Sequence, residues 1–137
     1  MDAGRILDHQ WVDDGPGWAA VEVSSAEEVL ALEPDFSGLP EAMVGVVGAR
    51  GRRGPGEAAY EVRAFAPGAG VAEDPVTGSL NASIGQWFLA RGDVPLPYTV
   101  SQGARVGRAG LLTASHVEGA VWVGGAAITR IVGEVAM

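Results

Sequence analysis

Residues 65–92, FAPGAGVAEDPVTGSLNASIGQWFLARG, decide the fold, because a strand end, a glycine-rich loop and a long helix follow one another there. In the helical part the large apolar residues recur at helical spacing and form one continuous stripe. They are Leu80, Ile84, Trp87 and Phe88. Gly92 supplies the C-terminal cap, because glycine adopts left-handed dihedrals without steric cost. We therefore expect a long helix whose apolar stripe must be buried on more than one side.

Strand-like runs flank this helix on both sides. Apolar and β-branched residues between turn signals predict four runs before it and four after it. They are residues 9–12, 18–23, 43–48 and 59–66, then 98–101, 110–116, 120–123 and 126–135. The last four are joined by short turns and predict an antiparallel meander. We expect an α+β fold in which an antiparallel sheet wraps around the long central helix.

A second, shorter helix is predicted between the early strands. Ser25 and Glu28 form a capping box, in which the serine oxygen accepts from a helical amide and the glutamate reaches back to the cap. This helix should run to about Leu32, before Pro34. The sequence contains no internal repeat and no linker, and its 137 residues suit one domain. We therefore predict a single domain over residues 1–137.

Composition excludes several classes of function. The net charge of −8 disfavours nucleic-acid and anionic-membrane partners, since both would repel the chain. The absence of cysteine rules out disulfides, thiolate nucleophiles and zinc-thiolate sites. Residues 1–10 lack the apolar core of a signal peptide, and no run approaches the length of a membrane-spanning helix. We expect a soluble cytoplasmic protein with no nucleic-acid or membrane partner.

The candidate site lies where the long helix begins. The first backbone amides of a helix have no helical acceptor, and the helix dipole adds positive charge there. Gly78 allows a ligand close to these amides, and the Ser79 hydroxyl offers one more hydrogen bond. Glu73 and Asp74 stand just before them and could bind a substrate amine or hydroxyl. The pattern predicts a site for a carboxylate or phosphate, although Asp and Thr are also ordinary helix caps.

Other constellations give weaker signals. Three arginines in the loop 50–56 suggest a phosphate site, but no aromatic residues are interleaved with them. His9 and His116 lie far apart in sequence and show no metal-ligand spacing, so we predict no metal site. Ser79, His116 and Asp74 could be combined into a hydrolase triad, but the G-x-S-x-G elbow of such enzymes is absent.

The motif APGAGVAEDPVTGS, residues 66–79, resembles the C-terminal signature of the PhzF-like (phenazine biosynthesis-like) isomerases, which share the diaminopimelate-epimerase fold. The resemblance covers nearly the whole chain. DDGPGW and SAEEVL resemble the opening of that family's second lobe, and three later motifs resemble its closing strands. These motifs are residues 13–18 and 25–30, then Gln102-Gly103, Gly107-Arg108 and 121–125.

The resemblance implies two similar lobes with a substrate held between the N-termini of their helices. The family's reaction is a proton shift or epimerisation next to a carboxylate, best known for dihydro-3-hydroxyanthranilate, without metal or organic cofactor. Carried onto this chain, Asp74 would contact the polar groups of the substrate in a supporting catalytic role. Gly78 and Ser79 would hold the substrate through an amide and a hydroxyl, and on the local pattern we also expect Glu73 among the substrate-binding residues. We therefore expect a small carboxylate-bearing substrate and a biosynthetic role.

This sequence also departs from the family. The catalytic glutamate and a Gly-His-Ala-Thr-type motif belong to the first lobe, and neither occurs here. Asp14 stands where asparagine is common, and the absence of cysteine excludes the two-thiol chemistry of the related racemases. We therefore expect catalysis to need a homodimer or a separately encoded N-terminal lobe.

Three hypotheses stay open at this point. The first is a half-enzyme that becomes an isomerase with its partner. The second is a non-catalytic small-molecule-binding or interaction module derived from that lobe. The third is a truncated gene product without activity.

Overall fold

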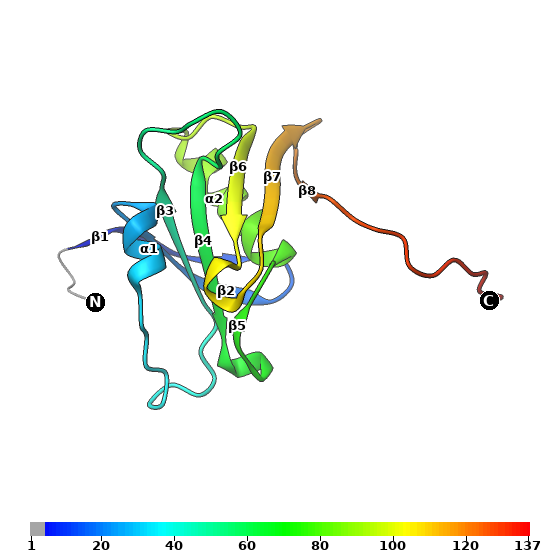
Figure 1. The fold of residues 1–137 in the computed structure, drawn as a ribbon, viewed down its shortest axis with the longest axis horizontal. Coiled ribbons are helices and arrows are strands. Elements are labelled where there is room, and N and C mark those ends of the chain that lie inside the picture. The colour runs from blue at the N-terminus through cyan, green and yellow to red at the C-terminus, as the bar shows by residue number, and fades with distance from the viewer. Residues whose placement is uncertain (1–4) are drawn as a thin grey trace.

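The computed structural model describes residues 5–137, so the first four residues of the predicted domain lie outside the described chain. An eight-stranded sheet and the helix α2 form its centre (Figure 1). In chain order the strands and α-helices are β1 (Ile6–Asp13), β2 (Gly17–Val23), α1 (Ala26–Ala31), β3 (Val44–Ala49), β4 (Tyr60–Ala66), β5 (Val71–Asp74), α2 (Gly78–Arg91), β6 (Tyr98–Gln102), β7 (Gly110–Val117) and β8 (Ala120–Gly125). Single 3₁₀ turns lie at Pro67–Ala69 and Ala104–Val106.

The sheet has the order β1-β2-β3-β4-β6-β7-β8, and β5 pairs with β4 beside this path. The α+β class and the sheet wrapped around a helix are confirmed, but the prediction of a purely antiparallel sheet is wrong. The pairs β2–β3 and β4–β6 are parallel. Each of these pairs is separated in sequence by a helix, α1 or α2. Parallel neighbours need such a crossover, which a tight turn cannot provide.

The core lies between α2 and the concave face of the sheet. The edge strands β1 and β8 both contact α2, so the sheet curls around the helix. Leu80, Ile84 and Phe88 are at most 1% exposed, which confirms the predicted stripe, and Trp87 is partly buried beside them. Burial of each such side chain contributes about 1.5–3 kcal/mol. The helix is modest in length, at 14 residues.

The short helix α1 covers the other face of the sheet, against β3 and β4. Val29 of α1 packs there with Phe65 of β4 in a second apolar cluster. Ser25 caps the helix by accepting from the Glu28 amide at 3.2 Å, as predicted. The Glu28 carboxylate reaches back one residue further than expected, to the amide and hydroxyl of Ser24 at 3.0 and 2.6 Å. The capping box is therefore present, but the Glu28 carboxylate accepts from Ser24 and not from the N-cap residue Ser25.

The predicted last strand, residues 126–135, is wrong. The chain carries no strand after β8, and the segment runs away from the sheet (Figure 1). Ile131 and Val132 are 91% and 88% exposed. Their β-branched pattern is typical of a strand, but a strand needs a partner, and β8 pairs only with β7 among the described strands. We call residues 126–137 the C-terminal arm.

One strand, β5, was not predicted. Its four residues lie in the glycine loop and pair with β4 through two matched positions around an irregularity. A strand this short gives no readable alternation, so local pattern does not reveal it. Within residues 5–137, no helix is long and apolar enough to cross a lipid bilayer.

Candidate functional site

The candidate site is built where β5 turns into α2. β5 runs back along β4, and Asp74 pairs with Ala64 at its end. Pro75 and Val76 then carry the chain into α2, with Thr77 at the N-cap in an extended conformation. Successive side chains of a strand point to opposite faces, so Glu73 and Asp74 face different sides of the sheet.

The start of α2 is not capped by a side chain of the described chain. Asn81 is the first residue whose amide bonds back into the helix, to the Thr77 carbonyl at 3.2 Å. The amides of Gly78, Ser79 and Leu80 therefore precede the helical ladder, at the positive end of the dipole. Gly78 is exposed, and a methyl group placed on it would have no neighbour within 4 Å. The backbone is therefore open to solvent at this point.

The Asp74 side chain is held by a residue of the turn that follows it. One carboxylate oxygen, Oδ2, accepts from the Thr77 hydroxyl at 2.6 Å. The Thr77 hydroxyl in turn accepts from the side-chain amide of Gln102 at 2.9 Å. Thr77 and Gln102 are 6% and 1% exposed, whereas Asp74 is half-buried. The other oxygen, Oδ1, has no hydrogen bond in the described chain, so it can accept from a substrate.

A side chain of the β1–β2 hairpin forms a hydrogen bond with Ser79. The indole nitrogen of Trp18, a residue only 2% exposed, donates to the Ser79 hydroxyl at 3.3 Å. One acceptor position of the hydroxyl oxygen is thereby used, and its hydrogen remains available for a substrate oxygen. Trp18 belongs to the motif of residues 13–18, so this bond joins two motifs that lie far apart in the sequence. Asp14, in the same motif, is exposed in the turn between β1 and β2.

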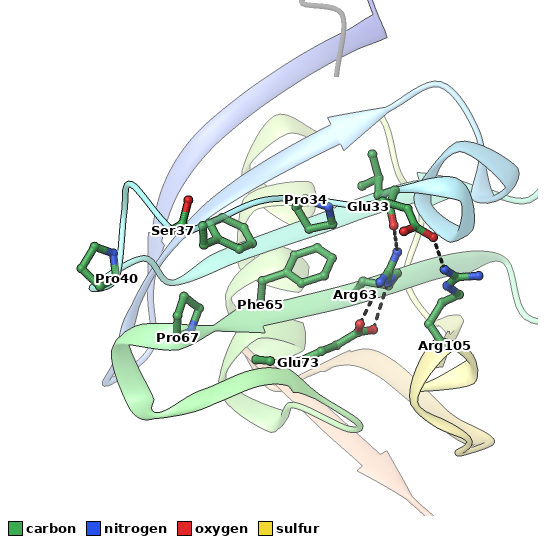
Figure 2. Close-up of a pocket in the computed structure, with 12 residues that line it drawn as sticks. Glu33, Pro34, Ser37, Pro40, Arg63, Phe65, Pro67, Glu73 and Arg105 are labelled. Atoms are coloured by element: carbon green, nitrogen blue, oxygen red, sulfur yellow. Dashed lines mark hydrogen bonds and ion pairs between the residues drawn. The ribbon is translucent and has the colours of Figure 1, made fainter.

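Glu73 does not join the other three predicted site residues. Its two carboxylate oxygens accept from Arg63 at 2.9 and 2.8 Å, in a bidentate ion pair (Figure 2). Arg63 also donates to the carbonyls of Val29 and Leu32 at the end of α1, at 3.2 and 2.7 Å. Both side chains of the pair are at most 10% exposed. The geometry gives Glu73 a structural partner on the face away from α2.

A cavity of about 660 Å³ lies on this outer face, against the Arg63–Glu73 pair (Figure 2). Proline and phenylalanine side chains form its apolar walls, and Arg105 pairs with Glu33 at its rim, 2.6 Å apart. The apolar residues are Leu32, Pro34, Phe36, Pro40, Phe65, Pro67 and Ala72. Each charged side chain that lines the cavity in the described chain is paired with another, Arg63 with Glu73 and Arg105 with Glu33.

The weaker alternatives gain no geometric support. Within residues 5–137 the Ser79 hydroxyl bonds to Trp18 and makes no bond to His116 or Asp74. Arg50, the first arginine of the loop 50–56, bonds to the buried carboxylate of Glu61 at 2.8 Å. Among residues 5–137 no three acidic or histidine side chains come together as a metal-binding group.

The structure thus places Asp74, Gly78 and Ser79 at one junction, between β5 and α2, and adds three contacting residues that the sequence did not indicate as site residues. These are Trp18, Asn81 and Gln102. Trp18 and Gln102 lie within motifs that resemble the PhzF-like pattern, and this was the only signal that could have found them. Asn81 carried no signal, because a polar residue inside an amphipathic helix normally faces solvent.

The chain is similar to known proteins over most of its length. The model of the family described as phenazine biosynthesis-like protein (PhzC-PhzF) matches residues 2–133. The curated relatives include "Antisense-enhancing sequence 1" of Schizosaccharomyces pombe, 33% identical over 90% of this chain and 45% of that protein. They also include "Uncharacterized isomerase YddE" of Escherichia coli K12, 32% identical over 62% of this chain and 31% of that protein.

Solved structures show the same fold. A PhzF-family protein from Enterococcus faecalis superposes with a TM-score of 0.68 at 25% identity, over 88% of this chain and 43% of that one. A PhzF-family protein from Bacillus anthracis gives a TM-score of 0.57 at 17% identity, over 80% and 41% of the two chains. The chain therefore spans less than half the length of these relatives.

Proposed function

We propose, since the chain belongs to the phenazine biosynthesis-like (PhzC-PhzF) family, that it is the substrate-holding half of an isomerase. The reaction would be a cofactor-independent proton shift on a small carboxylate metabolite, in a biosynthetic role. The observation that carries this proposal is the uncapped start of α2, with Asp74 and the Ser79 hydroxyl beside it. The other half would close the site and supply the proton-transferring group.

The groups at the start of α2 would stabilise negative charge on the substrate. The amides of Gly78 and Ser79 would bind the substrate carboxylate, whose charge the helix dipole also stabilises. Removing a proton next to that carboxylate moves negative charge onto its oxygens in the transition state. Donors already held in place stabilise that charge, and loss of one such donor typically costs about 10²–10³-fold in rate. Asp74 Oδ1 would accept from a substrate amine or hydroxyl and fix its orientation.

The general acid or base would come from a second lobe, because the family's catalytic glutamate has no counterpart in this sequence. We propose that this lobe is a second copy of the chain or a separately encoded N-terminal lobe, in the cytoplasm. The C-terminal arm supports association, since Ile128, Ile131, Val132 and Val135 are at least 75% exposed. Contiguous exposed apolar surface is a common mark of an interaction site.

Titration with anthranilate, a small aromatic carboxylate, tests the site. We expect the backbone amide resonances of Gly78 and Ser79 to shift in a saturable manner. Asp74→Asn should weaken binding by about tenfold, the effect of losing one charge-assisted hydrogen bond. Asp35→Asn is the matched control, because Asp35 is an exposed carboxylate in the loop after α1, and it should leave binding unchanged. Absence of shifts at both amides would show that no such site exists.

A second candidate is a binding module without catalysis. It is favoured because the described site offers uncapped helix amides and a serine hydroxyl but no assigned proton-transferring group. The two proposals differ in one measurement. If the chain binds anthranilate but exchanges no substrate proton with deuterated water, alone or with a partner lobe from its own organism, the binding module is correct.

A further inference from the structure

We propose that Gln102 is a positioning residue of this site. Its side-chain amide holds the turn from Asp74 to Thr77 so that Asp74 keeps one oxygen free and the first amides of α2 stay uncapped. The role of this arrangement in substrate binding rests on the proposed function, whereas the arrangement itself can be tested without any ligand.

Every hydrogen-bonding position of the Gln102 side chain is used. Its nitrogen donates to the Asp74 carbonyl at 3.0 Å and to the Thr77 hydroxyl at 2.9 Å. Its oxygen accepts from the Thr77 amide at 3.2 Å and from the Asn81 side chain at 2.8 Å. Two donors and two acceptor positions are all that a glutamine offers. The residue is 1% exposed, so these partners are not exchanged for water.

The orientation of this amide is also fixed. Asn81 donates from the same nitrogen to the Thr77 carbonyl at 2.8 Å, so that nitrogen must face Gln102. A flipped Gln102 would place its NH₂ group against the Thr77 amide and the Asn81 NH₂, which are both donors. Only one arrangement therefore satisfies the buried groups, and an unsatisfied buried donor is costly.

This arrangement determines what the Thr77 hydroxyl does. At the N-cap, a threonine oxygen commonly accepts from the second or third helical amide. Here the oxygen accepts from Gln102 instead, and the hydroxyl hydrogen is directed to Asp74 Oδ2 at 2.6 Å. Within residues 5–137, no side chain caps the start of this helix. The amides of Ser79 and Leu80 therefore remain without a side-chain acceptor, as an anion site requires.

The backbone beside Gln102 supports the same turn. Gly103 has a φ of +98°, and a methyl group on it would lie 2.6 Å from the Pro75 carbonyl oxygen. A methyl group on Gly110, the partner of Gln102 across β6 and β7, would lie 2.5 Å from Val76. The end of β6 and the start of β7 thus pack directly against Pro75 and Val76. Gln102 forms the hydrogen bonds at this contact.

The test uses Gln102→Glu, which keeps the oxygen that accepts both bonds, removes the two donors and replaces them by a buried carboxylate oxygen. The freed Thr77 oxygen should then cap the helix, so hydrogen exchange at the Ser79 and Leu80 amides should slow by about fivefold, the factor for a cap of typical strength. A merely structural role for Gln102 predicts the opposite, because a loosened turn exchanges faster. Faster or unchanged exchange would overturn the proposal.

Two further variants keep the proposal falsifiable if Gln102→Glu does not fold. Thr77→Val removes the hydroxyl that would form the cap, so exchange at Ser79 and Leu80 should not slow, and slower exchange would contradict us. Glu61→Gln is the control, because Glu61 is equally buried at 1% but belongs to the opposite face of the sheet. It should leave exchange at both amides unchanged.

Anthranilate titration of the same variants separates this inference from the proposed function. If the cap forms in Gln102→Glu, the dissociation constant should rise by at least about fivefold, since the cap competes for the same amides. If wild type does not bind anthranilate, the proposed function fails, and the exchange rates still decide the role of Gln102.

Discussion

The indole nitrogen of Trp18 donates to the hydroxyl of Ser79 across 61 positions of sequence, at 3.3 Å. The bond ties the β1–β2 hairpin to the start of α2, and it lies at the centre of the candidate site. Trp18 is buried to 2% exposure, so the bond cannot be replaced by water without opening the core.

Trp18→Phe should therefore lower the free energy of unfolding by about 1–3 kcal/mol, through the lost hydrogen bond and the smaller ring. Urea denaturation measures this change. Trp122→Phe is the matched control, because Trp122 is 62% exposed and should change stability by less than about 0.5 kcal/mol. Equal losses in the two variants would show that Trp18 has no special structural role.

Glu73→Gln should destabilise the fold without affecting ligand binding. Removing one partner of a buried ion pair leaves the other charge uncompensated and costs about 3–5 kcal/mol. Arg63→Met together with Glu73→Leu should recover most of that loss, because no charge is then left buried. The chemical-shift changes that anthranilate causes at the Gly78 amide should persist in any variant that folds. Their loss would show that Glu73 takes part in substrate binding.

Burial raises the pKa of Glu61 above its ordinary value, and the nearby Ser101 hydroxyl and the charge of Arg50 lower it in part. A raised folded-state pKa means that the native state binds the proton more tightly than the unfolded chain. This contribution is fully present below the unfolded pKa and is lost as pH rises through the folded pKa. The stability of wild type relative to Glu61→Gln should therefore fall with rising pH across the acidic range, as thermal unfolding can show. If the stability of wild type relative to Glu61→Gln rose with pH instead, the folded-state pKa of Glu61 would have to be lowered, contrary to this prediction.

Gly45→Ala should overpack the core. An added methyl group at Gly45 would lie 2.4 Å from Leu80 Cδ1, at the contact between β3 and α2. Such overpacking typically costs about 1–3 kcal/mol. Gly38→Ala is the control, because a methyl group there has no neighbour within 4 Å. Denaturant unfolding should separate the two variants.

Ile131→Ser with Val132→Ser should leave the unfolding of the domain unchanged to within about 0.5 kcal/mol, because both side chains are exposed. The same change should lower the mass of any assembly that light scattering detects in wild type. An assembly that survives the double substitution would show that the C-terminal arm does not hold it together.

Local signals accounted for much of the fold. The stripe of Leu80, Ile84 and Phe88 predicted the central helix and its burial, and Ser25 with Glu28 predicted α1. The arm was mispredicted as a strand because Ile131 and Val132 have strand propensity, and propensity does not reveal whether a pairing edge exists. Glu73 and Asp74 were grouped because they are neighbours in sequence, but strand alternation sends their side chains to opposite faces.

The sequence by itself determined the class of the fold, the helix start at Gly78 and the resemblance on which the functional hypothesis depends. The helix start is encoded in neighbouring residues, where periodicity and capping chemistry operate, and the fold class and the resemblance rest on short local motifs distributed along the chain. Only the tertiary structure decided that Glu73 pairs with Arg63, and that Trp18 and Gln102 form hydrogen bonds with residues at the start of α2. Those contacts join residues that are distant in sequence, and they exist only because the sheet curls around α2 and brings its strands together.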